Sequence, residues 1–284
     1  MQPLRIGARV FEGPGPFLMG VVNVTPDSFS DGGRFLDPGA ALAHALQLVS
    51  EGADLLDVGG ESTRPGALDV EVAEEIRRVV PVIARIRAAG CDAPISIDTR
   101  KAEVARAALD AGADLVNDVS ALGDPGMAEV VAARGAPVVL QHMRGTPGDM
   151  AARAVYADVV SEVERALAEA LARAVAGGIA EERVVLDPGL GFAKKPEHDL
   201  ALLAALPRLR RLGRPLLVGP SRKSFIGQVS GAGVGDRLPG TLAAVAACAL
   251  AGVEFVRVHD VAPARQAARV AAAIRAASSS GGEG

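Results

Sequence analysis

Three stretches of the chain, 51-EGADLLD-57, 111-AGADLVN-117 and 251-AGVEFVR-257, repeat one pattern. In each, an amphipathic segment stops at a glycine that suits the left-handed position after a helix C-terminus. A short apolar run follows and ends on a polar side chain. A helix followed by a short buried strand, repeated along a chain, predicts β/α units around a parallel sheet.

The number of these units predicts an α/β fold of the (β/α)8 type, the TIM barrel. Eight short apolar runs are the expected strands: Leu18–Val24, Leu55–Val58, Ile95–Asp98, Leu115–Asn117, Val138–Gln141, Val184–Asp187, Leu216–Gly219 and Phe255–Val258. The expected helices are Pro38–Ser50, Val70–Ala89, Ala102–Asp110, Pro125–Ala133, Tyr156–Ala176, Glu197–Leu212, Gly240–Ala251 and Pro263–Ala277. An open doubly wound sheet competes, but no glycine-rich dinucleotide loop follows the first strand.

We expect a single domain over residues 1–277, because no linker divides the sequence and 284 residues suit an undivided barrel. The opening residues, Leu4–Val10, are predicted to form a short strand or a hairpin that plugs the barrel bottom. The tail, residues 278–284, is rich in Ser and Gly, so we expect it to be disordered.

Composition argues against several classes of partner. The formal net charge is −4 and no basic stripe carries interleaved aromatic residues, which argues against nucleic acid. The longest apolar run, Leu242–Val253, is about half the length that a membrane span needs, and no signal pattern opens the chain. Neither Cys91 nor Cys248 has metal or redox spacing, so a reducing cytoplasm is the expected location.

Polar side chains close every predicted strand, and function in a β/α barrel lies at those ends. They are Asn23, Asp57, Asp98, Asn117, Gln141 with His142, Asp187, Ser221 to Lys223, and Arg257 with His259. A single Asp in such a place is often only the N-cap of the next helix, and Asp98 and Asp118 each fit that interpretation. Eight converging polar ends do not, so the pattern predicts a binding site.

The polar ends divide by charge. Asp98, Asn117 and Asp187 offer acceptors that need partners when buried, and an amino group beside a ring N–H, as in a guanine-like or pterin ring, would supply them. The cationic residues suit phosphate or carboxylate oxygens; they are Arg64, Arg222, Lys223, Arg257 and His259. The chain has no Trp, so a flat ring is expected to stack on Arg257 or Phe192.

Two long polar loops follow the first two strands, 25-TPDSFSDGG-33 and 59-GGESTRPG-66. They could be ordinary surface loops, but their paired glycines also suit mobile lids over a site. Asp27 and Asp31 could help to hold Mg²⁺, which prefers hard oxygen ligands and substrate phosphates.

Motifs from the first strand to the last resemble those of dihydropteroate synthases. The two most specific are 23-NVTPDSFSDGG-33 and 221-SRKSFIG-227, and others follow the same order, among them 95-ISIDTRKAEVA-105, 141-QHMRGTPGDM-150 and 257-RVHDV-261. The resemblance implies a transferase of folate biosynthesis. It would join p-aminobenzoate to 6-hydroxymethyl-7,8-dihydropterin pyrophosphate, giving 7,8-dihydropteroate and pyrophosphate, with Mg²⁺ as cofactor.

The resemblance also implies roles for individual residues. The pterin would be held by Asp98, Asn117, Asp187, Lys223, Arg257, Met143 and Phe192. Pyrophosphate would bind Asn23, Thr63, Arg64, Arg257 and His259, with Asn23 also on the metal. The p-aminobenzoate site, where sulfonamides compete, would involve Thr63, Pro65, Arg222 and Ser224. The expected catalytic residues are Asp27, Phe29, Asp98, Asp187 and Lys223, the first two from a loop that closes over the reacting centre.

An SN1-like route is expected from the same resemblance. Because an aniline nitrogen is a weak nucleophile, pyrophosphate would leave first and a pterin-stabilised cation would remain. The cationic residues and the metal would stabilise the leaving group, while Asp98 and Asp187 would stabilise the positive charge. No nucleophilic Ser or Cys is required.

Two positions depart from the family pattern. Ala193 stands where many members have Gly, which leaves the role of Lys194 open, and Gln141 stands where Met is common. Two alternatives remain: a corrinoid-linked methyltetrahydrofolate methyltransferase on a similar barrel, and a catalytically silent pterin-binding protein. The family is typically dimeric, so a homodimer is expected, with the Ala-rich helices near the C-terminus as a possible interface.

Overall fold

The computed structural model describes residues 3–24, 38–64 and 66–280. Its centre is a parallel sheet of eight strands in the order β8-β7-β6-β5-β4-β3-β10-β9. The strands are β3 (Phe17–Asn23), β4 (Leu55–Gly59), β5 (Ile95–Asp98), β6 (Leu115–Asp118), β7 (Val138–Gln141), β8 (Val184–Asp187), β9 (Leu217–Val218) and β10 (Phe255–Val258). A parallel bridge between Leu186 and Leu216 joins the two ends of this order, so the barrel nearly closes. The predicted (β/α)8 barrel is confirmed.

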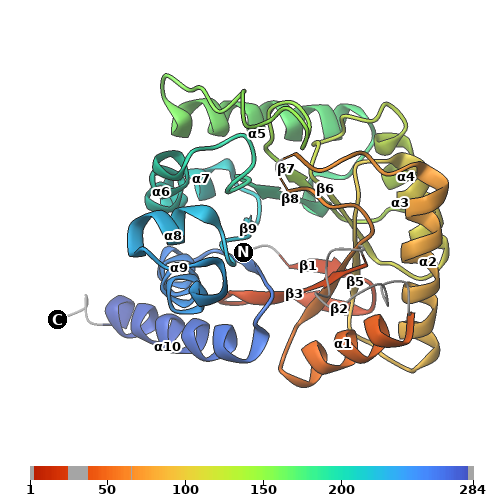
Figure 1. Cartoon of the computed structure of the whole chain (residues 1–284), viewed down its shortest axis with the longest axis horizontal. Coiled ribbons are helices and arrows are strands. Elements are labelled where there is room, and N and C mark those ends of the chain that lie inside the picture. The colour runs from red at the N-terminus through yellow and green to blue at the C-terminus, as the bar shows by residue number, and fades with distance from the viewer. Residues whose placement is uncertain (1–2, 25–37, 65, 281–284) are drawn as a thin grey trace.

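Helices surround the barrel on its outside (Figure 1). They are α1 (Pro38–Ser50), α2 (Val72–Ala88), α3 (Ala102–Asp110), α4 (Met127–Arg134), α5 (Val159–Ala176), α6 (Pro196–Ala204), α7 (Leu206–Leu209), α8 (Ser224–Ser230), α9 (Leu238–Ala251) and α10 (Val261–Ser280). The glycines of the repeated pattern, Gly52, Gly112 and Gly252, all have positive φ, as expected of glycines that follow helix C-termini. No helix within the described ranges is long and apolar enough to cross a membrane.

The strand alternation separates an apolar layer inside the barrel from a polar one. A buried cluster contains one residue from each of seven strands: Met19, Leu55, Leu115, Val139, Val185, Leu217 and Phe255. Side chains two residues apart share a face of a strand, so the next inward positions are two residues further along. On five strands those positions are polar: Asp57, Asn117, Gln141, Asp187 and Arg257. Apolar packing therefore fills the lower half of the barrel, and the polar groups gather above it.

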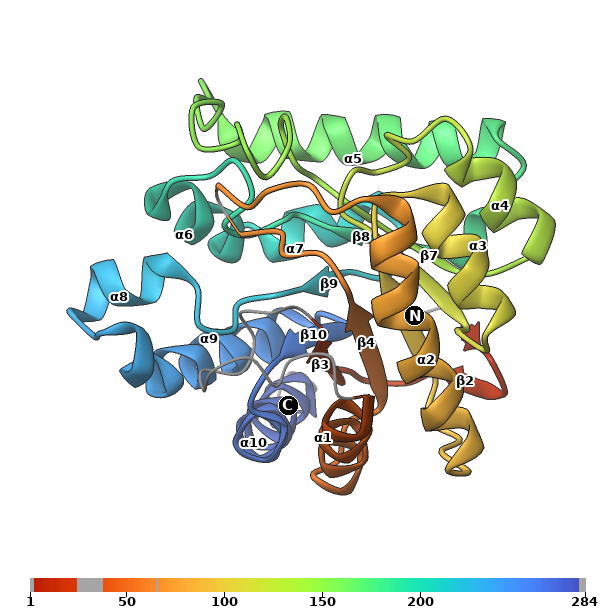
Figure 2. The same cartoon turned by 45° about the vertical axis from the view of Figure 1, so that its right-hand side comes forward.

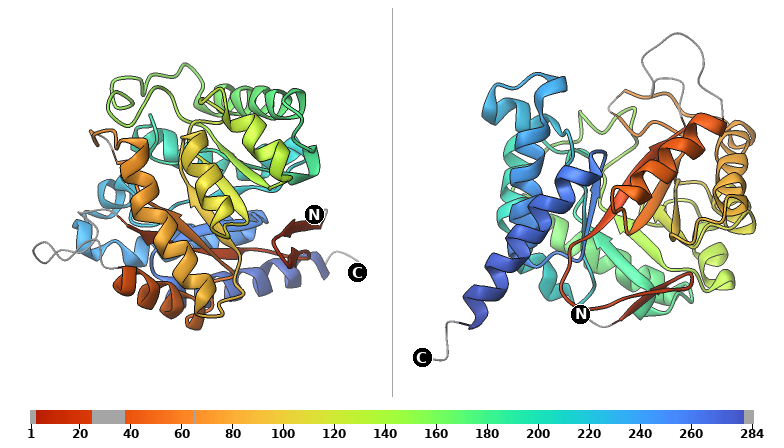
Figure 3. Two further views of the ribbon diagram at one scale, coloured as in Figure 1. Left: turned by 90° about the vertical axis from the view of Figure 1, so that its right-hand side faces the viewer. Right: turned by 90° about the horizontal axis from the view of Figure 1, so that it is seen from below.

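A hairpin closes the lower end of the barrel. Strands β1 (Leu4–Ile6) and β2 (Arg9–Phe11) pair antiparallel, and Leu4, Ile6 and Phe11 belong to the apolar cluster inside the barrel. The right-hand view of Figure 3 shows this hairpin at the end opposite to α8. The predicted hairpin plug is confirmed, and it covers the end of the barrel opposite to the polar strand ends.

Three elements differ from the prediction. The expected helix Glu197–Leu212 is divided into α6, α7 and a 3₁₀ turn over Arg210–Leu212, because Pro207 has no N–H to continue the first helix. Helix α8 was not predicted; it projects beyond the barrel beside α9 (Figure 2). Residues Ser278–Ser280 belong to α10 and are not a disordered tail, while residues 281–284 lie outside the described ranges.

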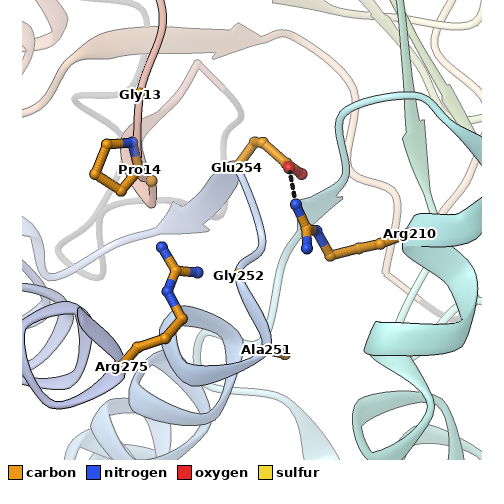
Figure 4. A pocket seen from close by; sticks show the side chains of 8 residues that line it. Gly13, Pro14, Arg210, Ala251, Gly252, Glu254 and Arg275 are labelled. Atoms are coloured by element: carbon orange, nitrogen blue, oxygen red, sulfur yellow. Dashed lines mark hydrogen bonds and ion pairs between the residues drawn. The ribbon is translucent and has the colours of Figure 1, made fainter. Parts of the chain in front are cut away.

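A cavity of about 310 Å³ lies beside the chain that enters β3, far from the polar strand ends (Figure 4). Arg210 pairs with Glu254 at 2.7 Å, and Nη1 of Arg275 donates to the carbonyl oxygen of Ala249 at 2.9 Å. Because the carbonyl groups of the last turn of α9 are the negative end of a helix dipole, Arg275 stabilises that end. The charged residues that line this cavity therefore stabilise the fold, through an ion pair and the end of a helix.

Candidate active site

Arg257 links two buried carboxylates at the strand ends. Its Nε donates to Oδ2 of Asp57 at 2.5 Å and its Nη2 to Oδ2 of Asp98 at 2.7 Å. The Nδ2 group of Asn117 also donates to Oδ2 of Asp57, at 3.2 Å. Residues from β4, β5, β6 and β10 therefore meet in one network, although Arg257 was expected to belong to a separate cationic side.

Asp57, Asp98 and Asn117 each keep one side-chain oxygen that has no hydrogen-bond partner among the described residues. They are Oδ1 of Asp57, Oδ1 of Asp98 and Oδ1 of Asn117, and all three are buried. Buried acceptors without partners cost free energy of folding. A ligand that presents several N–H groups would satisfy them.

The carboxyl group of Asp98 has a higher pKa than a carboxyl group on the surface. Burial raises its pKa to about 7, the carboxylates of Asp57, Glu75 and Glu61 add to this, and Arg257 opposes it. Asp118, by contrast, accepts from the N–H groups of Ser120 and Leu122 within its own turn. Asp118 therefore stabilises a turn, and neither Asp118 nor Asp98 is a helix N-cap, because α3 follows Lys101 and α4 follows Gly126.

Asp187 ends β8 with its carboxylate buried. Oδ1 accepts from the N–H of Gly189 at 2.6 Å, and burial raises the pKa of the group to about 6 in spite of this bond and of the nearby Lys223 and Lys194. A carboxyl group with a raised pKa beside amines with lowered pKa values is typical of a functional site.

Lys223 lies on the loop after β9, with Nζ 4.4 Å from the centre of the Phe192 ring. Burial lowers the pKa of this amine to about 8, although Asp199, Asp187 and Asp98 oppose the effect. A side chain at Gly191 would lie within 3.3 Å of this ammonium group, so the glycine leaves room for it. The structure thus brings Lys223, Phe192 and Asp187 together.

Two expected anion-binding residues on the neighbouring loops already have partners. Nδ1 of His259 lies 2.9 Å from Oγ of Ser221, and burial, together with the charges of Arg257 and Arg222, lowers its pKa to about 3. Arg222 donates twice to Asp260, at 3.0 and 2.7 Å. Burial therefore favours the neutral form of His259 in the ligand-free chain, and its role at pyrophosphate stays a prediction.

A buried ion-pair network fixes the loop after β4. Glu61 accepts from Arg100 at 3.0 Å, from Lys101 at 2.8 Å and from the N–H of Val70 at 2.8 Å. Burial alone would raise the pKa of Glu61, but these bonds hold it below its usual value. Lys101 also reaches the fully buried Glu75 at 2.6 Å. The loop that carries Thr63 and Arg64 is thereby tied to the end of β5.

The remaining predicted residues lie around this centre or outside the described ranges. Asn23 ends β3 and pairs with Gly59 of β4, Met143 packs against Phe192, and Ser224 begins α8. Asp27, Phe29, Asp31 and Pro65 fall outside the described residues. The roles assigned to all of these residues stay predictions.

Sequence reasoning placed Asp57 among the polar strand ends but assigned it no role, although the residue closes one of the repeated patterns. Its carboxylate is fully buried and joins Arg257 to Asn117. The signal was present, because Asp57 occupies the same place in its pattern as Asn117. The links Ser221–His259 and His142–Lys194 had no such signal, because the partners are far apart in the chain.

Comparison with known proteins agrees with this site. The model of the pterin binding enzyme family matches residues 19–259. Dihydropteroate synthase of Escherichia coli (strain K12) is 47% identical over 255 residues, 90% of each chain.

Two solved structures share the fold along nearly the whole chain. One is the Yersinia pestis dihydropteroate synthase with a sulfonamide drug complex, 42% identical with a TM-score of 0.91, covering 97% of this chain and 100% of that one. The other is the Xanthomonas albilineans enzyme with 4-aminobenzoic acid, 49% identical with a TM-score of 0.90, covering 96% and 98%. The chain belongs to the pterin-binding enzymes and, among them, to the dihydropteroate synthases.

Proposed function

We propose that the polar strand ends of this chain hold 6-hydroxymethyl-7,8-dihydropterin pyrophosphate and join it to p-aminobenzoate, and that Asp98, Asn117 and Asp187 bind the pterin. The observation that carries this is the set of buried oxygens without partners on Asp57, Asp98 and Asn117. A dihydropterin presents an amino group and ring N–H groups to such acceptors. Lys223 supplies a donor for the oxygen and nitrogen acceptors of the ring.

The proposed reaction breaks the C–O bond to pyrophosphate before the C–N bond forms. The electron pair of the C–O bond leaves with pyrophosphate, and the positive charge spreads into the pterin. Asp98 and Asp187, when ionised, stabilise that charge from fixed positions, which costs little reorganisation. The amine of p-aminobenzoate then attacks the carbon, and its extra proton passes to solvent or to pyrophosphate.

Arg257 has two tasks in this proposal. Its guanidinium holds Asp57 and Asp98 in place, and its flat face is available for stacking on the pterin. Arg64, His259 and Asn23 would bind pyrophosphate oxygens. Arg64 is exposed and His259 is half-buried, so Arg64 would contact the leaving group from the solvent side.

Mg²⁺ is proposed as the cofactor. No group of three or more His, Cys, Asp or Glu ligands occurs among the described residues, so that part of the protein offers chiefly the amide oxygen of Asn23. This fits Mg²⁺, which keeps waters and binds through substrate phosphates. When bound, the ion would neutralise charge on the departing pyrophosphate. Asp27 and Asp31 remain possible further ligands.

The p-aminobenzoate site is proposed beside the loops after β4 and β9, at Thr63, Arg222 and Ser224, with Pro65 as a further candidate. Thr63 is half-buried, whereas Arg222 and Ser224 are exposed, so this substrate would enter from the solvent side. Arg222 would have to share its guanidinium with Asp260 or move.

A homodimer in the cytoplasm is also proposed. An apolar groove of about 370 Å³ runs between α9 and α10, lined by Leu242, Ala246, Leu250, Pro263, Gln266, Ala267, Val270, Ala271 and Ile274. Val270 and Ile274 are 58% and 54% exposed, and contiguous exposed apolar surface marks interaction sites. Two free, buried cysteines support a reducing location.

Pyrophosphate release tests the reaction directly. The purified chain, supplied with Mg²⁺, is expected to release pyrophosphate only when p-aminobenzoate and the pterin pyrophosphate are both present, and a sulfonamide should suppress the release. Dihydropteroate is measured in the same samples by chromatography. Release that does not depend on p-aminobenzoate, or no release at all, contradicts the proposal.

A further inference from the structure

Lys194 lies on the loop after β8, and its ammonium group contacts two loops at once. Nζ lies 2.9 Å from Nδ1 of His142 and 3.4 Å from the carbonyl oxygen of the same residue, and it donates to the carbonyl oxygen of Phe192 at 2.9 Å. An ammonium group has three donors, and each has an acceptor here. The side chain therefore fastens the loop after β7 to the loop after β8.

The two fastened loops carry apolar residues that were expected to line the pterin. Met143 follows His142 directly, and it packs in one cluster with Phe192, Ala193 and Met150. The backbones also meet closely, because a side chain at Gly189 would collide with the carbonyl oxygen of His142. Lys194 thus holds together the two segments that carry Met143 and Phe192.

His142, which accepts the hydrogen bond from Lys194, does not change its protonation near neutral pH. His142 is buried and its Nδ1 accepts from the ammonium group, so the neutral ring carries its proton on Nε2. Burial, with the charges of Lys194 and Arg144, lowers the pKa of His142 to about 3. The protonation of Lys194 alone therefore decides how many donors the contact has.

We propose that Lys194 is a positioning residue for pterin binding, which holds Phe192 and Met143 in place through the contact with His142. The inference deepens the function proposed above and rests on the pterin roles assigned there. Thr63 and Ser224, the proposed p-aminobenzoate residues, lie on the loops after β4 and β9, and among the described residues Lys194 forms its hydrogen bonds only with His142 and Phe192. Its loss should therefore affect one substrate and not the other.

Titratable groups from several elements face Lys194: the neutral His142 and the charged Arg144 after β7, Asp187 on β8, Asp199 on α6 and Lys223 after β9. Burial lowers the pKa of Lys194 to about 7, Asp199 and Asp187 oppose this, and Lys223 and Arg144 add to it. When the pH rises through that value, the contact loses its charge and one of its three donors. Pterin binding should weaken in the same range.

Steady-state kinetics of the full chain test the proposal with Lys194→Met and the matched control Lys195→Met, an exposed neighbour. We expect Lys194→Met to raise the KM for the pterin pyrophosphate about tenfold, because charge-assisted hydrogen bonds are lost. The kcat and the KM for p-aminobenzoate should stay within about twofold, and Lys195→Met should leave all three parameters unchanged.

Lys194→Arg supplies the second readout, because a guanidinium keeps its charge at every accessible pH. Lys194→Arg should recover most of the lost affinity for the pterin pyrophosphate. In wild type, the KM for this substrate should rise between about pH 6.5 and pH 8.5, and Lys194→Arg should lack the part of that rise that comes from deprotonation of Lys194. An unchanged KM in Lys194→Met overturns the proposal, as does an equal effect on both substrates. If Lys194→Met does not fold, identical pH profiles of wild type and Lys194→Arg overturn it. Wild-type turnover in the same assay tests the proposed function separately.

Discussion

At the scale of single residues, the strand ends place carboxyl groups where they are poorly solvated. Asp98 and Asp187 are 7% and 3% exposed, and burial raises the pKa of each group to about 7 and about 6. A raised carboxyl pKa means that the folded chain binds a proton more tightly than the unfolded chain. The arrangement suits a ligand rich in N–H groups and destabilises the ligand-free protein at neutral pH.

Asp187→Asn should stabilise the ligand-free chain in a pH-dependent way. In wild type, the contribution of Asp187 to the free energy of unfolding is most favourable below the unfolded pKa near 4, and it falls as the pH rises to about 6, by roughly 3 kcal/mol in total. The amide does not titrate, so the gain from the substitution should be larger at pH 8 than at pH 4.5. Urea denaturation at both values measures it.

The control for this substitution is Asp236→Asn, at an exposed position, which should change stability little at either pH. The variant Asp187→Asn should also bind the pterin substrate poorly, as isothermal titration would show. A gain in stability that is equal at the two pH values would falsify the account of Asp187 as a buried, poorly compensated carboxylate.

At the scale of elements, the N-terminal hairpin contributes to stability rather than to chemistry. The ring of Phe11 lies 5.0 Å from that of Phe17 and 5.4 Å from that of Phe255, measured between centroids. Phe11→Ala should lower the free energy of unfolding by about 3–5 kcal/mol, as cavities in a core do. The KM values for both substrates should not change.

Val10→Ala is the matched control, because Val10 lies on the same strand with its side chain exposed. It should cost less than about 1 kcal/mol. The comparison is made by chemical denaturation, with kinetics on the folded fraction. A large change in KM for Phe11→Ala would mean that the hairpin influences the strand ends after all.

The elements that were wrongly predicted have local causes. The apolar pattern over Glu197–Leu212 continues through Pro207, so periodicity alone does not reveal that the helix restarts there. Helix α8 is short, and its first residue, Ser224, belongs to a motif that was used to identify the family and not to predict a helix. Ala193 adopts φ +50°, a conformation that costs a non-glycine residue about 1–2 kcal/mol. That cost explains why Gly is common at this position.

At the scale of the whole molecule, the apolar groove between α9 and α10 is the proposed dimer interface. Ile274→Glu should place a charge in this apolar surface and turn a dimer into a monomer, because an unpaired charge is costly to bury. Analytical ultracentrifugation measures the change. Val175→Glu on α5, where the side chain is 45% exposed, is the control and should leave the mass unchanged. A wild-type chain that sediments as a monomer contradicts the proposed homodimer.

The sequence by itself determined the barrel, the hairpin plug and most of the positions that carry polar groups. These features depend on local signals: glycines after helices, apolar runs of strand length, and the alternation that places Asp57 two residues after Leu55 and Asn117 two after Leu115. The motifs also identified the family. Such information is contained in neighbouring residues, so it can be read without knowing how the chain closes on itself.

Only the tertiary structure decided which polar groups hold one another. Arg257 and Asp57 are 200 residues apart, and they meet because β10 and β4 flank β3 in the barrel. Lys194 and His142, 52 residues apart, meet because the segments after β8 and β7 are neighbours. Charge, burial and pKa depend on such distances, since electrostatic energy falls with separation and rises as water is excluded. Order along the chain does not contain those distances.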